Sequence, residues 1–169
     1  MNRKEYSLGL YEKSMPKTLT WAQKLEIAKR AGFDFVEISI DETDEKLSRL
    51  DMTTAERLEL LTIMSRSGIR IETMCLSGHR KYPLGSADTQ TRERSLDIME
   101  KAIILARDLG IRIIQIAGYD VYYEKSTDVT RALFADGLQK SVALAAKYGV
   151  MLAFETMETE FINTVEKAM

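Results

Sequence analysis

Glu155 is the residue with the clearest potential for chemistry, because it ends the apolar run 151–155. Within that run Leu152 and Phe154 alternate with smaller or polar side chains, so Glu155 shares the face opposite to them. A carboxylate in such a place can bind a divalent metal ion or transfer a proton. A glutamate that merely begins a loop is the alternative, and position and facing together favour a catalytic and metal-binding role for Glu155.

Two further polar side chains, Glu37 and Gln115, alternate with apolar residues inside the runs 35–40 and 113–117. They share the face of Glu155 once these runs pair in one sheet. A buried carboxylate needs a partner, so Glu37 either pairs with an Arg or Lys in the interior or contacts a substrate. Gln115 is a similar polar group, and both are candidate substrate-binding residues.

The segment CLSGHRKYPLGS places His79, Arg80 and Lys81 directly after another apolar run. A histidine and two cations in one loop suit a phosphorylated or hydroxylated ligand, so all three are candidate substrate-binding residues. A solvated loop is the alternative. Other polar residues follow neighbouring runs, and the tyrosines among them could wall a sugar site. These residues are Glu12, Tyr119, Asp120, Tyr122 and Tyr123.

The composition argues against several classes of function. The 169 residues carry a net charge of −2 without a basic run, so nucleic acid is a poor partner on electrostatic grounds. His79 is the only histidine and Cys75 the only cysteine, which excludes a site built from several histidines of this chain and an internal disulfide. The absence of disulfides fits the cytoplasm, and residues 1–13 hold no apolar stretch long enough for a signal peptide or membrane span.

The elements that must position the candidate residues repeat along the chain. Four segments share one order of helical end, glycine and apolar strand: AKRAGFDFVEISI, MSRSGIRIETMCL, ARDLGIRIIQIAG and AAKYGVMLAFE. Each glycine falls where a helix needs a left-handed residue at its C-terminus. The four are Gly32, Gly68, Gly110 and Gly149. One helix plus one strand per repeat is the βαβ unit, whose strands run parallel.

With a first strand at 6–11, the repeats predict an α/β fold of five parallel strands in sequential order, and a further helix from Thr159. Thr20 and Thr53 open two of the connecting helices as capping boxes. A doubly wound, flavodoxin-like sheet would be apolar on both faces, whereas these strands are apolar on one face and small or polar on the other. That pattern favours a (β/α)8 TIM-type barrel. A full barrel needs about 250 residues, so we expect residues 1–169 to be a single domain, the N-terminal part of an incomplete barrel.

Five segments of the chain form a recognisable set: LGLYEK, GFDFVEISIDETDEKLSRLD, MCLSGHRKYPLGS, LDIMEKAI and GIRIIQIAGYDVYYE. Together they resemble the L-ribulose-5-phosphate 3-epimerase family, also called L-xylulose-5-phosphate 3-epimerase, of L-ascorbate degradation and pentose catabolism. The resemblance extends from Tyr6 to Met169, and DFVEISIDETDEKLSRLD and GYDVYYE are specific beyond a generic barrel motif. It implies a xylose-isomerase-like TIM barrel.

The resemblance also implies an isomerase of carbohydrate metabolism that inverts C3 of a ketopentose phosphate. In this family's chemistry one divalent ion (Mn, Mg, Co or Zn) holds the substrate and stabilises an enediolate, while two glutamates exchange the C3 proton. Glu155 matches the first metal-binding and acid–base glutamate of the family. The later ligands, an Asp, a His and a second Glu, belong to strands beyond residue 169, so this chain alone is expected to be inactive. A cytoplasmic homo-oligomer with a small sugar-phosphate substrate, and no nucleic-acid or membrane partner, is expected.

Two other functions compete with the epimerase. A DNA-repair nuclease of the endonuclease IV type shares the barrel, but it needs several histidine ligands and a basic groove, which one histidine and a net charge of −2 disfavour. A non-catalytic truncated fragment that persists by self-association is the third interpretation.

Overall fold

Strands and helices alternate along residues 5–169, the part of the chain that the computed structural model describes. Residues 1–4 lie outside the described part of the chain. They are the first residues of the segment 1–13, which is expected to hold no signal peptide. The strands are β1 (Gly9–Tyr11), β2 (Phe35–Ile40), β3 (Arg70–Leu76), β4 (Ile113–Ala117) and β5 (Met151–Glu155). The helices are α1 (Trp21–Arg30), α2 (Asp44–Leu47), α3 (Thr54–Ser67), α4 (Thr89–Leu109), α5 (Asp128–Tyr148) and α6 (Val165–Ala168). Three short 3-10 helices are η1 (Glu12–Ser14), η2 (Ser48–Asp51) and η3 (Gly78–Arg80).

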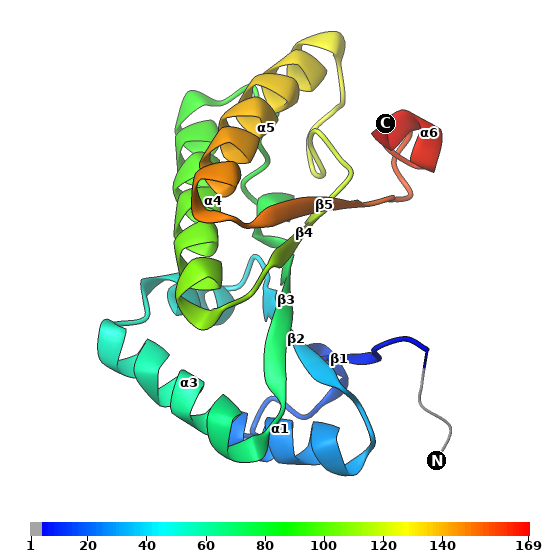
Figure 1. The fold of residues 1–169 in the computed structure, drawn as a ribbon. Coiled ribbons are helices and arrows are strands. Elements are labelled where there is room, and N and C mark those ends of the chain that lie inside the picture. The colour runs from blue at the N-terminus through cyan, green and yellow to red at the C-terminus, as the bar shows by residue number, and fades with distance from the viewer. Residues whose placement is uncertain (1–4) are drawn as a thin grey trace.

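The five strands form one parallel sheet in the order β1-β2-β3-β4-β5. This confirms the sequential order predicted from the repeats and excludes a flavodoxin-like arrangement. Figure 1 shows the sheet as an arc, with α1, α3, α4 and α5 along its outer side. Such an arrangement is a partial TIM-type barrel, in which β1 and β5 are the two edges of the described sheet.

The large apolar side chains of the strands point toward the outer helices and form the core. Val36, Ile38, Met74 and Ile114 are all fully buried. Leu25 of α1 and a row of residues on α4 cover them from outside: Ile98, Ala102, Leu105 and Leu109. Burial of each such side chain contributes about 1.5–3 kcal/mol. The alternation seen in the sequence is therefore confirmed, and it leaves the other face of each strand for polar residues.

The predicted helix ends are also confirmed. The side chains of Thr20 and Thr53 each accept a hydrogen bond from the backbone three residues on, and the side chains of Gln23 and Glu56 accept one from the backbone N of Thr20 and Thr53, which makes two complete capping boxes. Gly32, Gly68, Gly110 and Gly149 all have positive φ, between 66° and 82°. A side chain would be strained there, so these four glycines allow each helix to turn into the next strand.

Two predicted elements differ from the structure at their beginnings. The first strand begins at Gly9 rather than at residue 6, because the backbone of Leu8 bonds instead with Asp34, whose carboxylate accepts from Leu8 N at 2.7 Å. The last helix begins at Val165, capped by Thr164, and not at Thr159. Between β5 and this helix the chain makes a loop in which Met157 N donates to Ile162 O at 2.9 Å.

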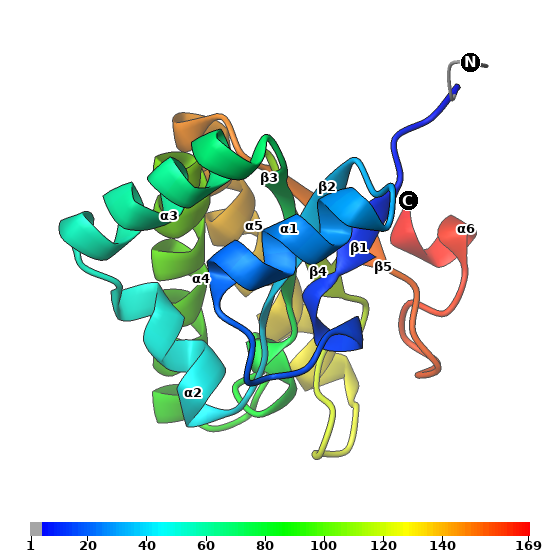
Figure 2. The same cartoon turned by 90° about the horizontal axis from the view of Figure 1, so that it is seen from below.

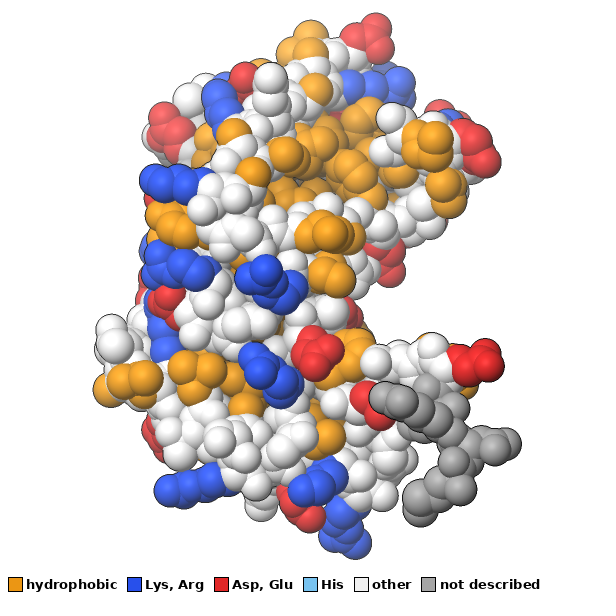
Figure 3. All heavy atoms as spheres, in the orientation of Figure 1, with side chains coloured by type: hydrophobic (Ala, Val, Ile, Leu, Met, Phe, Trp, Pro, Cys, Tyr) orange, Lys and Arg blue, Asp and Glu red, His pale blue; other side chains and the backbone are white. Residues whose placement is uncertain are grey.

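The inner side of the arc is open. Figure 2 shows α6 apart from the other helices, beyond the edges formed by β1 and β5. Figure 3 shows this side hollowed, with apolar side chains gathered in its upper part and charged ones around its lower part. None of the helices within residues 5–169 is long and apolar enough to cross a membrane.

Candidate active site

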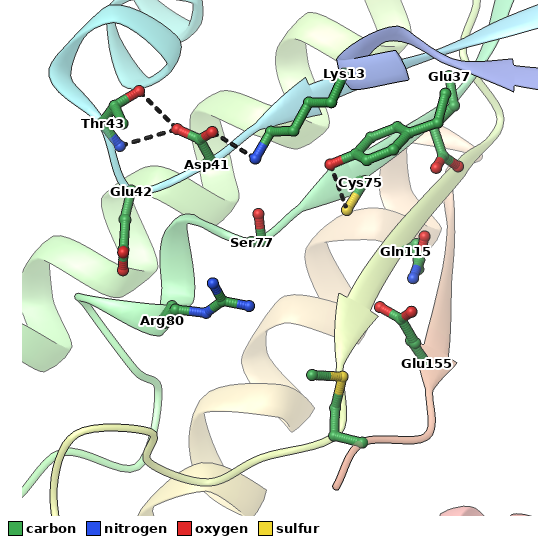
Figure 4. Close-up of a pocket in the computed structure, with 12 residues that line it drawn as sticks. Lys13, Glu37, Asp41, Glu42, Thr43, Cys75, Ser77, Arg80, Gln115 and Glu155 are labelled. Atoms are coloured by element: carbon green, nitrogen blue, oxygen red, sulfur yellow. Dashed lines mark hydrogen bonds and ion pairs between the residues drawn. The ribbon is translucent and has the colours of Figure 1, made fainter.

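A cleft of about 470 Å³ lies on the inner face of the sheet, near the C-terminal ends of the strands. Four of the residues singled out from the sequence line it, namely Glu37, Arg80, Gln115 and Glu155. In Figure 4, Glu37, Gln115 and Glu155 occupy one side of the cleft, and Glu42 and Arg80 the other. Residues that are far apart in the chain therefore meet in one space, as the strand alternation predicts.

The register of the sheet explains why these side chains meet. Tyr11 lies opposite Glu37, and Gln115 lies opposite Cys75. Glu155 ends the last strand opposite Ala117. Because paired residues of neighbouring strands point to the same face, the polar positions of successive strands form one lining. Glu155 itself is exposed to solvent in this open half of the cleft.

Glu37 finds its partner on the neighbouring strand. Thr73 Oγ1 donates a hydrogen bond of 2.7 Å to Glu37 Oε2. One of the two possibilities raised for Glu37, an ion pair with Arg or Lys, does not occur among residues 5–169. The carboxylate is instead oriented by a hydroxyl group, which leaves its charge free to act on a ligand in the cleft.

Tyr11 and Cys75 supply an uncharged part of the lining. The Tyr11 hydroxyl donates to Ser39 Oγ at 3.2 Å and contacts Cys75 Sγ at 3.7 Å. Burial raises the pKa of Tyr11 and also the pKa of Cys75. Both groups therefore stay protonated near neutral pH, and the Cys75 thiol is not activated as a nucleophile.

Lys13 and Asp41 form an ion pair at the rim of the cleft, 2.6 Å from Nζ to Oδ2. Thr43 donates to the same carboxylate from its backbone N at 2.9 Å and from its hydroxyl at 2.6 Å. Although burial opposes it, these hydrogen bonds hold the pKa of Asp41 at about 2. Asp41 therefore stays ionised and neutralises the charge of Lys13.

The three residues of the loop after β3 separate in the structure. Arg80 lines the cleft, whereas His79 and Lys81 do not. The His79 ring is buried and its Nε2 lies 3.3 Å from Ser95 O, and burial lowers the pKa of His79 to about 4. Lys81 lies over the ring of Tyr82, 5.3 Å from its centroid. Only Arg80 of the three is in a position to contact a ligand in the described cleft.

The tyrosines after β4 lie next to Arg80 but do not line the cleft. Tyr119, Tyr122 and Tyr123 make a series of edge-to-face contacts, with ring centroids 5.2 and 5.0 Å apart. The Tyr123 hydroxyl donates to Glu42 Oε1 at 3.0 Å, which links the loop after β4 to the loop after β2. These tyrosines do not line the described cleft, and their role as the wall of a sugar site stays a prediction.

Sequence reasoning missed a buried charge cluster next to the cleft. Glu12, only 1 % exposed, accepts hydrogen bonds from Lys46, from Arg49 at 2.6 Å and from Lys24 at 3.5 Å. Its Oε2 also accepts from Ser39 N at 3.2 Å. Lys46 and Arg49 are three residues apart, a spacing that places them on one helical face. That spacing was the only local signal for the cluster.

The cleft does not form a metal site from its own residues. Within residues 5–169 no group of three His, Cys, Asp or Glu side chains is placed to hold a metal ion. Glu155 offers a strand-end carboxylate, but a divalent ion needs several oxygen or nitrogen ligands. The described residues therefore do not fit a complete metal centre.

Comparison with known proteins gives consistent matches. Residues 25–169 match the family model of the xylose isomerase-like TIM barrel. The chain is 50% identical over 169 residues to the L-ribulose-5-phosphate 3-epimerase UlaE of Salmonella heidelberg (strain SL476), covering 100% of this chain and 60% of that protein. It is 49% identical, with the same coverage, to UlaE of Escherichia coli O139:H28 (strain E24377A / ETEC). The chain thus spans 60% of the length of these curated relatives.

Solved structures support the fold. The D-psicose 3-epimerase of Clostridium cellulolyticum H10, solved with D-tagatose, superposes with a TM-score of 0.80 at 18% identity, covering 96% of this chain and 57% of that one. An L-ribulose 3-epimerase superposes with a TM-score of 0.67 at 23% identity, covering 95% of this chain and 54% of that one. At these identities the likeness concerns the architecture alone.

Proposed function

Since the chain belongs to the xylose isomerase-like TIM barrel family, we propose that the whole protein is an isomerase that epimerises a ketopentose phosphate at C3. L-Ribulose 5-phosphate and L-xylulose 5-phosphate are the proposed pair, because relatives about half identical to this chain are named L-ribulose-5-phosphate 3-epimerases. The observation that supports the proposal most is the position of Glu155. It ends β5 and lines the cleft beside Gln115.

Glu155 is the proposed general acid–base group. Its carboxylate would take the proton from C3, which is acidic because C3 is next to the C2 ketone. A second acid group, expected outside residues 1–169, would deliver a proton to the opposite face of C3 and so invert that carbon. Glu37 and Gln115, on the same side of the cleft, are proposed to bind substrate hydroxyl or carbonyl oxygens. A substrate-binding role for His79 and Lys81 remains a prediction, because neither side chain lines the described cleft.

A divalent metal ion is part of the proposal for the whole protein. Glu155 would supply one ligand, and the others would come from residues outside 1–169, since the described residues make no complete site. Residues 1–169 by themselves are accordingly proposed to be inactive. A cytoplasmic homo-oligomer in pentose or L-ascorbate breakdown completes the proposal, and a single cysteine is compatible with that location.

The function can be tested with the full-length protein and L-ribulose 5-phosphate in D₂O. We expect L-xylulose 5-phosphate to form, with deuterium entering at C3 alone, as followed by NMR. Absence of both product and C3 exchange, with and without added Mn²⁺, Mg²⁺, Co²⁺ or Zn²⁺, would overturn the proposal. Cleavage of abasic DNA under the same conditions would support the nuclease, which the four carboxylates lining the cleft disfavour. Those carboxylates are Glu37, Asp41, Glu42 and Glu155.

A further inference from the structure

The balance of charge in the cleft singles out one cation. Its lining holds four carboxylates but only two cations, Lys13 and Arg80. A phosphate group is repelled by carboxylates, so it must lie against a cation that is still available. Lys13 is committed to Asp41 at 2.6 Å. Arg80 is therefore the cation that remains among the residues lining this cleft.

The Arg80 side chain lacks the partners that an arginine usually has. No ion pair within residues 5–169 involves its guanidinium, and its Nε is buried without a hydrogen-bond partner. The buried hydroxyl of Tyr119 interacts with Arg80 without forming a well-aligned hydrogen bond. Buried polar groups are normally satisfied, so the guanidinium of Arg80, which lines the cleft without an ion-pair partner, points to an anionic ligand there.

The ring of Tyr122 contacts the guanidinium without using its N–H groups. Arg80 Cζ lies 4.7 Å from the centroid of the Tyr122 ring, and the Tyr122 hydroxyl donates a hydrogen bond of 3.3 Å to Glu158 Oε1. A guanidinium stacked on a ring keeps its N–H edges free in its own plane. Those edges match two oxygens of a phosphate group. Burial works against the charge of Arg80, but Tyr119, Tyr122 and Glu42 raise its pKa, so it stays charged.

We propose that Arg80, held by Tyr122, binds the phosphate group of the substrate and selects phosphorylated over free ketoses. This inference rests on the proposed function and names the residues that bind the phosphate group. Figure 4 places Arg80 across the cleft from Glu155. A ketopentose phosphate anchored at Arg80 would therefore extend its carbon chain toward the carboxylate that acts at C3.

The test compares Arg80→Gln and Arg80→Lys with the unmodified full-length protein. We expect Arg80→Gln to lower kcat/KM for L-ribulose 5-phosphate by about 10- to 100-fold, mainly through KM, because a charge-assisted contact is lost. For free L-ribulose the change should stay within about twofold. Arg80→Lys keeps the charge but loses the two-pronged geometry, so its loss should be intermediate. Calorimetric titration with inorganic phosphate provides a readout that does not depend on turnover.

Arg107→Gln is the matched control. Arg107 also stacks on a tyrosine, with Cζ 5.0 Å from the Tyr148 centroid, but it lies in the last turn of α4 and outside the cleft. The Arg107→Gln substitution removes one positive charge, as Arg80→Gln does, and should leave phosphate binding unchanged. Tyr122 is a positioning residue in this scheme. Tyr122→Phe should keep phosphate affinity, whereas Tyr122→Leu should weaken it and leave the KM for free L-ribulose unchanged.

The outcomes separate this inference from the proposed function. Equal losses for both ketoses in Arg80→Gln, or unchanged phosphate binding, would overturn it. The anion would then bind elsewhere, for example in the cavity of about 230 Å³ lined by Lys17. If the unmodified protein turns over neither ketose, but Arg80→Gln alone weakens phosphate binding, the epimerase proposal fails and the phosphate site stands.

Discussion

Glu12 Oε2 and Arg49 Nη1 meet at 2.6 Å in the interior, where the Glu12 side chain is only 1 % exposed. Lys24 and Lys46 share the same carboxylate, so one buried anion holds three cations from α1, α2 and η2. Burial raises the pKa of Glu12, but hydrogen bonds from Arg49 and Lys46 outweigh it and lower the pKa overall. The cluster joins the end of β1 to the segments that follow β2.

Glu12→Gln should destabilise the protein strongly, because it leaves the buried cations without a counter-charge. Breaking a buried ion pair in this way costs about 3–5 kcal/mol. Urea unfolding of the full-length protein would measure the change in free energy of unfolding. Asp136→Asn is the control, because it removes the same charge from an exposed pair with Lys140, which contributes at most about 1 kcal/mol. Similar effects of the two substitutions would contradict this account of the cluster.

The burial of His79 makes stability depend on pH. Its folded-state pKa is about 4, below the unfolded value of about 6.5, so between these values the unfolded state binds more protons. Stability from neutral His79 is fully present above pH 6.5 and falls as pH drops toward 4, by about 3 kcal/mol in total. The difference in unfolding free energy between the unmodified protein and His79→Gln should shrink over this window. A difference independent of pH would show that the pKa of His79 is the same in the folded and unfolded states.

Glu155→Gln in the full-length protein should keep the fold and lose C3 exchange. Gln is nearly the same size, but it cannot accept the C3 proton and is a poorer metal ligand. A loss of about 10²–10⁴ in kcat is expected from removal of a general base, measured by deuterium entry at C3. Glu158→Gln, in the loop after β5, is a useful comparison. Turnover by Glu155→Gln close to that of the unmodified protein would remove Glu155 from the mechanism.

Gly118 is placed to affect Glu155 through the backbone. Its N–H donates to Glu155 O at 2.9 Å, and a Cβ at position 118 would lie 2.9 Å from that oxygen and 2.8 Å from Ile162 Cβ. Gly118→Ala should therefore cost about 1–3 kcal/mol and lower kcat by shifting the end of β5. Gly137→Ala, whose Cβ meets the flexible Leu84 Cδ2 at 3.1 Å, should leave kcat unchanged. Equal kcat values for the two variants would refute the argument.

A polypeptide of residues 1–169 alone should associate with copies of itself. Its two sheet edges, β1 and β5, carry unpaired backbone groups, and Leu8 and Met151 beside them are 43% and 63% exposed. Analytical ultracentrifugation over a range of concentrations should find dimers or larger species. A monomer at every concentration that also unfolds cooperatively in urea would contradict this expectation.

The positions that follow a period along the chain could be predicted from the sequence. The alternation of Ile38 with Glu37, or of Ile114 with Gln115, already assigns each side chain to the helices or to the inner face, because strand periodicity has only two directions. The same reasoning placed Glu155 in the cleft lining. Glycine spacing predicted the helix ends, since few other residues tolerate positive φ.

What the sequence could not predict are contacts between long side chains from distant elements. Glu12 and Arg49 are far apart in the chain, and nothing local to Glu12 indicates that its carboxylate is buried. His79 and Arg80 are neighbours of similar polarity, yet one turns toward Ser95 and the other toward the cleft. That choice depends on the space left by α4, which no pattern within the loop encodes.

The sequential order of the sheet has a consequence for how the protein acquires its structure. Each strand pairs with the strand that precedes it in the chain, and the intervening helix covers the pair that has just formed. Within the described sheet no strand has to wait for a distant segment before it can bond to its neighbour, so between β1 and β5 chain closure is required only over one repeat at a time. Assembly can therefore advance from β1 during synthesis on the ribosome, with Glu155 the last of the described cleft residues on the strands to reach its place.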